Sequence, residues 1–152
     1  LRSRKASLAM AAETFARLNI AMSDAFVAAW HTKYKLNVVR PVTYGQVVID
    51  SNWVPSLIPT PPFPDYPSGH YVQSAAASMV LDMAFGADTA FTDNAHNDRG
   101  WGPRTFKNFK AAADEAAISR LYAGIHYRFA IEGGKPQGRC VAAKVLALKF
   151  KP

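Results

Sequence analysis

Cysteine is almost absent from this chain of 152 residues, which contains only Cys140. A single cysteine excludes an internal disulfide and leaves the redox compartment open. Long apolar runs are also missing, since none reaches the ~18–20 residues that a membrane-spanning helix needs. We therefore expect a protein that is not an integral membrane protein.

Several familiar site motifs are absent as well. The chain contains no HExxH, CxxC, Walker or GxGxxG pattern, so zinc, nucleotide and dinucleotide sites are not supported. His31 and His96 have no ligand-like spacing and are expected to be structural or surface residues. No signal peptide is visible and the chain begins at Leu1, so we expect the C-terminal part of a longer protein, with a periplasmic or secreted location.

What is present indicates a globular domain. Hydrophobic residues make up 49% of the chain and charged residues 19%, which is typical of a folded protein. The length suits one domain with a real core, and we expect residues 1–152 to form a single catalytic domain. The net charge of +7 suits an anionic substrate, a nucleic acid or a membrane surface, without choosing among them.

Apolar residues at helical spacing predict an all-α fold, and no convincing pair of strands is visible. The predicted helices span residues 6–22, 25–34, a short segment from Pro41, 71–85, 106–121 and 128–150. Ser23 and Asp24 would cap the second helix. The first would bury its apolar line, which consists of Leu8, Ala12, Phe15, Leu18 and Met22.

Glycine and proline predict where these helices stop. We expect a break at Gly124, and a kink or early end near Gly133, Gly134 and Pro136. Residues 50–67 contain six prolines and should form an ordered loop. Residues 87–105 are polar and should form a long irregular loop.

The stretch Pro67-Ser68-Gly69-His70 stands between the proline-rich loop and a very apolar helix. Ser68 is a good N-cap residue, and Gly69 lets a backbone amide approach a ligand closely. A helix N-terminus favours an anion, and His70 can exchange a proton near neutral pH. An ordinary capped helix with a surface histidine is the simpler interpretation of these four residues.

Cations occur where apolar residues are expected. Arg120 continues the apolar face of its helix, which calls for an internal salt bridge to Glu115 or Asp114, or for a bound anion. Lys33 follows Trp30 by one turn, and Arg40 precedes Pro41 at an element boundary. A break at Gly124 could bring His126 to the same place. Such a set of cations, a hydroxyl and a helix N-terminus suits a tetrahedral oxyanion.

These residues form three motifs that follow one another along the chain. The first is Lys33 with Arg40-Pro41, the second is Pro67-Ser68-Gly69-His70, and the third is Ser119-Arg120 with His126. The order and spacing resemble the signature of the superfamily of type 2 phosphatidic acid phosphatases and vanadium-dependent haloperoxidases. The likeness runs from about Trp30 to the last helix. Residues 62–70 and 122–129 look most similar to the chloroperoxidase-like bacterial branch.

The resemblance implies a helical bundle, incomplete at its N-terminus, with the anion site between helices. It implies that a vanadate or phosphate is held by Lys33, Arg40, Ser68, Gly69 and Arg120. His126 would be the vanadium ligand or the nucleophile on phosphorus, and His70 the general acid or base on the other side. Trp30 and Phe63 would line an apolar halide side of the pocket, or would simply be core.

One departure concerns the residue four positions after the second histidine. The phosphatase signature usually has Asp there, to orient the imidazole, whereas this chain has Ala130. Glu132 is close in sequence but would point elsewhere on a helix. This departure puts phosphatase activity by the usual relay in doubt, but does not exclude vanadate binding.

Three functions follow as hypotheses. The first is a vanadate-dependent haloperoxidase that oxidises halide with hydrogen peroxide. The second is an acid phosphatase that uses a phosphohistidine at His126 and needs no cofactor. The third is a basic, non-catalytic anion-binding module for nucleic acid or anionic surfaces, with Lys144, Lys149 and Lys151 on an outward face. For the enzyme we expect small-molecule substrates and no nucleic acid partner. A missing segment or a second chain would complete the core.

Overall fold

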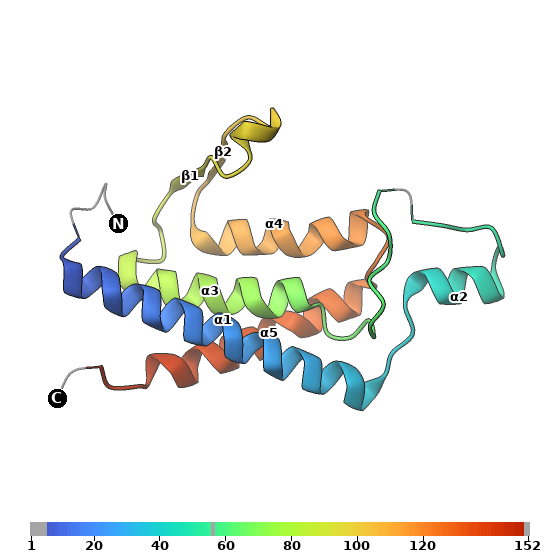
Figure 1. Cartoon of the computed structure of the whole chain (residues 1–152), viewed down its shortest axis with the longest axis horizontal. Coiled ribbons are helices and arrows are strands. Elements are labelled where there is room, and N and C mark those ends of the chain that lie inside the picture. The colour runs from blue at the N-terminus through green and yellow to red at the C-terminus, as the bar shows by residue number, and fades with distance from the viewer. Residues whose placement is uncertain (1–5, 56, 151–152) are drawn as a thin grey trace.

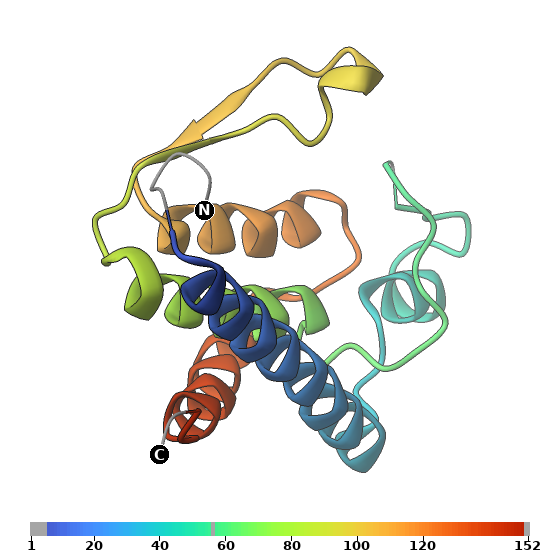
Figure 2. The ribbon, with the colours of Figure 1, turned by 60° about the vertical axis from the view of Figure 1, so that its left-hand side comes forward.

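The computed structural model describes residues 6–55 and 57–150, and within them it is an all-α bundle, as predicted. Four helices pack along one another (Figures 1 and 2), and they are α1 (Leu8–Leu36), α3 (Gly69–Phe85), α4 (Phe109–Tyr122) and α5 (Arg128–Leu146). A short helix, α2 (Pro41–Val48), stands apart at one end and begins at the predicted Pro41. None of the helices in the described ranges is long and apolar enough to cross a membrane.

Helix α3 is the centre of the bundle, and it packs against α1, α4 and α5. Its buried residues belong to two apolar clusters, one shared with α1 and α5 and one shared with α4 and α5. Most of the buried side chains in the first cluster are alanines or valines. Small side chains let the helices approach closely, so the N-terminus of α3 is fixed by contacts from several directions.

The predicted break in the first helix is wrong, because α1 runs through Ser23 and Asp24 without interruption. Both polar residues lie on the solvent side, where they need no partner from the protein. The buried face is also different from the predicted one, since it consists of Thr14, Ala21, Ala25, Ala29 and Lys33. Leu8 and Phe15 are exposed instead, with 87% and 55% of their surface accessible. Spacing alone could not show that α1 packs through its alanines.

An early end of the last helix, one of the two outcomes expected near Pro136, is wrong, since α5 continues past this residue. Pro136 removes one N–H and leaves the carbonyl of Glu132 without its helical donor. Both residues are exposed, so water can solvate that carbonyl. On the opposite face, a Cβ on Gly138 would lie 2.1 Å from the carbonyl oxygen of Val72. This close approach to α3 holds α5 in place.

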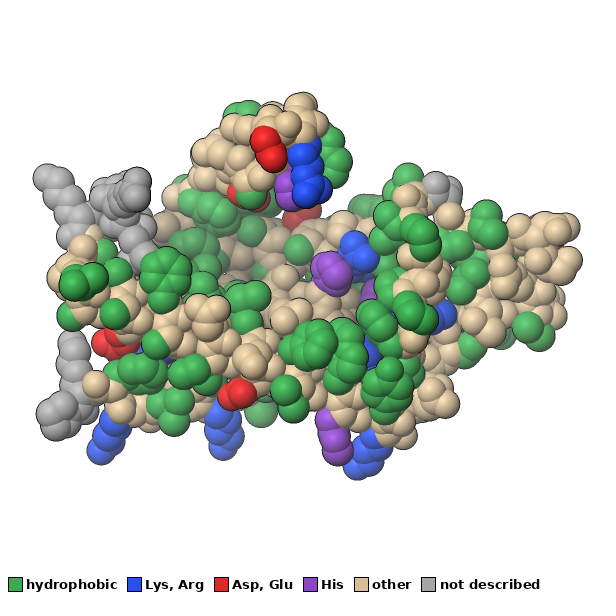
Figure 3. Space-filling model, in the orientation of Figure 1, with side chains coloured by type: hydrophobic (Ala, Val, Ile, Leu, Met, Phe, Trp, Pro, Cys, Tyr) green, Lys and Arg blue, Asp and Glu red, His purple; other side chains and the backbone are tan. Residues whose placement is uncertain are grey.

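The polar loop is more regular than predicted. It contains an antiparallel pair of short strands, β1 (Phe91–Asp93) and β2 (Arg104–Phe106), with a 3₁₀ turn, η2 (Asn97–Arg99), between them. The hairpin overhangs α4 (Figures 2 and 3). Phe91 stacks on Phe106 and on Phe109, at centroid distances of 5.4 and 5.1 Å, which ties the hairpin to α4.

Two connections position the residues of the candidate site. The proline-rich loop is tied down where Asp65 N–H donates to Val38 O at 2.9 Å and Ser68 N–H donates to Ala130 O at 2.8 Å. The break predicted at Gly124 is present, and this glycine has a φ of 73°, a conformation that other residues rarely adopt. The chain therefore reverses between α4 and α5 and carries His126 back toward the start of α3.

Candidate functional site

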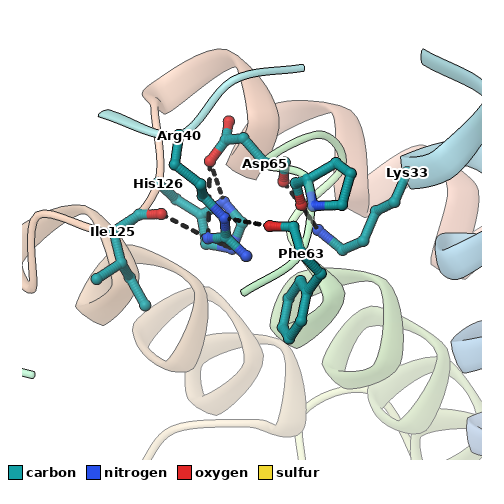
Figure 4. Close-up of polar contacts among 7 residues, drawn as sticks. Lys33, Arg40, Phe63, Asp65, Ile125 and His126 are labelled. Carbon is teal, nitrogen blue, oxygen red and sulfur yellow. Dashed lines mark hydrogen bonds and ion pairs between the residues drawn. The ribbon is translucent and has the colours of Figure 1, made fainter. Parts of the chain in front are cut away.

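Lys33 is the first cation of the site and is completely buried near the end of α1. Its Nζ donates to the carbonyl oxygens of Pro64 and Asp65, at 2.7 and 2.9 Å (Figure 4). Burial, with the neighbouring Arg40 as the second cause, lowers the pKa of Lys33 to about 7. The ammonium has three protons, so two carbonyl acceptors leave one proton for another acceptor.

Arg40, at the N-terminus of α2, is 5% exposed and links three parts of the site. Its Nε donates to Phe63 O at 2.7 Å, and its Nη1 donates to Ile125 O at 2.6 Å (Figure 4). The same Nη1 lies 3.2 Å from Nε2 of His126. Its Nη2 is buried and has no hydrogen-bond partner within the described residues. A buried donor of this kind is costly unless a ligand accepts from it.

Ser68 is the N-cap residue of α3, but its hydroxyl makes no capping hydrogen bond, contrary to the expectation. The hydroxyl is instead buried, with no partner among the residues that the structure describes. Gly69 follows at the first helical position, where a Cβ would lie 3.0 Å from the Trp30 ring. Any side chain there would press on Trp30, so glycine is the residue that fits the start of α3 beside this ring.

His126 is held by a carboxylate that the motifs did not reveal. Its Nδ1 lies 2.6 Å from Oδ1 of Asp65, which is fully buried, and Arg40 Nη1 lies 3.8 Å from the same oxygen (Figure 4). Because Asp65 accepts from Nδ1–H, the lone pair of the neutral ring is on Nε2. Burial lowers the pKa of His126, although the hydrogen bond to Asp65 acts to raise it.

Asp65 therefore orients the imidazole of His126, which Ala130 cannot do because it has no carboxylate. The sequence contains one hint, which is a lone carboxylate inside a proline-rich, apolar loop directly before the Pro67–His70 motif. Such a carboxylate is seldom buried without a charged or hydrogen-bonded partner. The partner could not be found from spacing, because it lies 61 residues away.

Arg120 approaches from α4, and its Nε is buried without a partner in the described part of the chain. The carboxylates considered as its partners are engaged with other groups. Glu115 pairs with Arg104 at 2.5 Å, and Asp114 pairs with Lys110 at 2.5 Å. The alternative of an internal salt bridge to Arg120 is therefore wrong for both carboxylates.

His70 lies at the second position of α3 and keeps contact with solvent. Partial burial is the main cause that lowers its pKa to about 4, and the charges of Arg120, His126 and Lys33 act in the same direction. The ring is therefore neutral at pH 7. His70 therefore lies close to Lys33 of α1, to Arg120 of α4 and to the second imidazole, His126.

Trp30 and Phe63 lie together against the two inner cations. Their ring centroids are 4.9 Å apart. The Phe63 centroid is 5.2 Å from Nζ of Lys33 and 4.9 Å from Cζ of Arg40. These distances are those of cation–π contacts, so the aromatic rings form an apolar wall beside a strongly positive region. Their role on the halide side stays a prediction.

The residues predicted to bind the anion and the two predicted catalytic histidines lie together near the start of α3, while their roles stay a prediction. These residues come from five segments, and they are Lys33, Arg40, Ser68, Gly69, His70, Arg120 and His126. His31 and His96 are exposed, in agreement with their surface assignment. Across residues 6–55 and 57–150, no cluster of three His, Cys, Asp or Glu side chains could hold a metal cation. Apart from the carboxylate of Asp65, which accepts from His126, the charged and polar side chains of the site are mainly donors, which suits an anion.

Comparison with known proteins shows the family and the fold of the chain. The family model of the VCPO (vanadium chloroperoxidase) second helical-bundle domain matches residues 45–151. The chain belongs to this family. A solved structure of a bacterial vanadium-dependent iodoperoxidase is 46% identical, with a TM-score of 0.90 over 95% of the chain. None of the curated protein sequences compared with the chain is similar to it.

More distant members of the vanadium haloperoxidase superfamily share the fold. The holo form of a bacterial vanadium-dependent chloroperoxidase is 21% identical, with a TM-score of 0.71 over 85% of this chain. The apo form gives 20% identity and a TM-score of 0.65 over 81% of the chain. The chain spans about a third of these relatives, which is 35% of the iodoperoxidase and 34% of each chloroperoxidase.

Proposed function

We propose that this site binds vanadate and that the protein oxidises halide with hydrogen peroxide. The observation that carries the proposal is a set of three buried donor atoms without protein acceptors, which are Arg40 Nη2, Ser68 Oγ and Arg120 Nε. Leaving such donors unpaired costs about 1–3 kcal/mol each. An oxyanion would accept from all of them, and the similarity to a vanadium-dependent iodoperoxidase supports vanadate as that anion.

The residues present fit vanadate in number and type. Arg40, Ser68 and Arg120 would donate to its oxygens, together with Lys33 and the amide of Gly69. The Nε2 lone pair of His126 would be the ligand of vanadium, because Nδ1 is committed to Asp65. When bound, vanadate supplies an electrophilic centre that activates peroxide toward attack by halide.

The remaining residues act on protons and on the halide. The neutral His70 would accept a proton from hydrogen peroxide at a ring nitrogen and later return it. Trp30 and Phe63 offer a weakly hydrated surface beside positive charge, where a halide ion loses water at little cost. The overall reaction is X⁻ + H₂O₂ + H⁺ → HOX + H₂O.

A phosphomonoesterase is the second candidate, and a specific contact favours keeping it. Asp65 orients His126 with its lone pair on Nε2, 3.2 Å from Arg40 Nη1. A nucleophile on phosphorus requires a lone pair on that atom. The absence of Asp at position 130 therefore does not remove the relay. The same cations would stabilise the equatorial oxygens of the transition state.

Two assays on one preparation separate these candidates. The haloperoxidase predicts vanadate-dependent oxidation of iodide or bromide by peroxide, with no hydrolysis of an aryl phosphate. The phosphatase predicts hydrolysis that vanadate inhibits. Either activity should fall at least 10³-fold in His126→Ala and persist in the control Arg104→Ala, whose side chain is exposed on β2. Activity that survives His126→Ala would exclude both mechanisms.

A further inference from the structure

A cavity of about 560 Å³ lies between the β1–β2 hairpin and α4, and the vanadate site does not use it. Its size is within the range of sites for small organic molecules. Aromatic rings from both elements line it, namely Phe91, Trp101, Phe106 and Tyr122. Figure 3 shows the hairpin projecting above the bundle, with a hollow between the two.

The frame of this cavity is fixed by contacts on both sides. Phe91 stacks between Phe106 and Phe109. The ion pair of Arg104 with Glu115, at 2.5 Å, joins β2 to α4 directly. Trp101 packs edge-on against His96 at 5.3 Å. Even so, Trp101 and Tyr122 keep 62% and 73% of their surface exposed, so their rings are available to a planar guest.

The charges of the lining select the kind of guest. Asp93 and Glu115 are the acids and Arg104 is the permanent cation, so carboxylates outnumber permanent cations in the lining. An anionic aromatic compound is therefore disfavoured, and so are halide and vanadate themselves. A neutral phenol fits better, because its ring can stack and its hydroxyl can donate to a carboxylate.

The cavity also lies beside the proposed chemistry. Ser119 and Tyr122 line it from the last turns of α4, and Arg120 on the same turn contributes to the anion site. A guest held along α4 would therefore lie within one helical turn of a residue of the proposed oxyanion site.

We propose that this cavity binds the organic acceptor of the oxidised halogen, and that this acceptor is a neutral phenol. The inference rests on the proposed haloperoxidase function. The step is HOX + ArH → ArX + H₂O, in which the O–X and one aryl C–H bond break. A C–X bond forms, and the displaced proton leaves in the water.

The direct test is ligand-observed NMR with phenol and vanadate-free protein, which does not depend on activity. We expect saturation transfer to phenol, weaker transfer to benzoate, and an affinity for phenol that falls roughly two- to tenfold in Trp101→Ala and Tyr122→Ala. The matched control is Phe15→Ala, which removes an exposed aromatic ring from the far half of α1. Equal phenol binding in wild type and both variants would overturn the proposal.

A kinetic test separates this proposal from the proposed function. Triiodide formation from iodide and peroxide needs no organic acceptor, so it should stay within twofold in Trp101→Ala, while the KM for phenol rises. If wild type forms no triiodide, the haloperoxidase function fails, and the NMR result still decides the cavity. If Trp101→Ala changes the oligomeric state in sedimentation and phenol does not bind, the face belongs to a protein partner and the phenol site is excluded.

Discussion

At the scale of single residues, Asp65 determines what His126 can do. Its carboxylate fixes the Nδ1–H tautomer and the ring orientation from 2.6 Å. Partners of this kind typically change metal affinity by about 10–100-fold when they are removed. We expect Asp65→Ala to weaken vanadate binding by about this factor, with Asp65→Asn in between because an amide oxygen still accepts from Nδ1–H.

Isothermal titration with vanadate measures this effect. The control is Asp24→Ala, which removes an exposed carboxylate from α1 and should leave the dissociation constant unchanged. Circular dichroism checks that each variant is folded. Vanadate affinity equal to wild type in a folded Asp65→Ala protein would show that the pairing has no part in binding.

Lys33 makes binding depend on pH. Its pKa in the anion-free protein is about 7, below the ordinary value of 10.5, so the lysine is increasingly neutral above pH 7. The unfolded chain then binds more protons than the folded one, and this group makes the anion-free protein more stable as pH rises from 7 toward 10.5. A bound anion favours the charged lysine, so vanadate affinity should fall above pH 7, by up to about tenfold per pH unit.

Dissociation constants between pH 6 and 9 test this expectation. Vanadate has its own ionisation in this range, so the slope is compared with that of Lys33→Met. The variant removes the lysine proton and should show a shallower dependence. Parallel slopes for the two proteins would mean that Lys33 does not titrate with binding.

Most of the site residues could be predicted from the sequence, because Lys33, Arg40, Ser68 and Arg120 stand in ordered motifs with helix breaks between them. The structure places them together, while their roles remain to be measured. Asp65 could not be assigned, since its partnership with His126 depends on how a loop folds over a helix turn 61 residues later. The unpaired hydroxyl of Ser68 could not be predicted from the sequence either, because the hydroxyl of an N-cap serine normally accepts a hydrogen bond from an amide of its own helix.

At the scale of elements, the crossing of α3 and α5 depends on a missing side chain. A Cβ at Gly138 would lie 2.1 Å from Val72 O and 3.0 Å from Ala75 Cβ. Backbone must move to admit it, so Gly138→Ala should lower the free energy of unfolding by about 1–3 kcal/mol or more. Gly102→Ala is the control, because nothing lies within 4 Å of its added Cβ. Urea unfolding that gives the same free energy for both variants would contradict this packing.

The far end of α5 depends on one guanidinium. Arg17 of α1 donates from Nη1 to Val145 O at 3.1 Å and from Nη2 to Leu148 O at 3.0 Å. These carbonyls lie at the C-terminal end of α5, where Val145 O also accepts from Leu148 N–H at 3.1 Å, and a cation at a helix C-terminus is favourable. We expect Arg17→Met to lower the free energy of unfolding by about 1–2 kcal/mol, since hydrogen bonds to charged groups are stronger than neutral ones.

Hydrogen exchange can localise that effect. In Arg17→Met the amides of the last turns of α5 should exchange faster, while those of α4 should stay as in wild type. Faster exchange throughout the bundle, with no preference for α5, would assign Arg17 a general role in the core instead.

The existence and order of the helices could be predicted, but not all of their limits. Ser23 and Asp24 suggested a cap because they favour helix starts, yet on an exposed face they are tolerated inside α1. Pro136 suggested a break, yet contacts of the α5 glycines with α3 compensate for one lost hydrogen bond. The three-residue strands were too short for a periodic pattern, and their pairing depends on Phe91 and Phe106 meeting across the hairpin.

At the scale of the whole molecule, the net charge of +7 also permits surface binding of a polyanion. A buried vanadate site and a surface that binds a polyanion differ in how their affinities respond to salt. A buried site is only weakly screened, so vanadate affinity should change less than about threefold between 50 and 200 mM potassium acetate. A nucleic-acid-binding module would lose about 10³–10⁵ in affinity over the same range. Titrations at both concentrations, with vanadate and with a DNA duplex, distinguish them.

The central claim is that the bundle gathers an oxyanion site with Nε2 of His126 as the ligand of vanadium. The most direct measurement is a crystal structure of the protein grown with orthovanadate. The account predicts vanadium bonded to Nε2 of His126, with its oxygens on Arg40, Arg120 and the Ser68 hydroxyl. Vanadate bound elsewhere, with His126 and Arg120 contacting only protein, would contradict it.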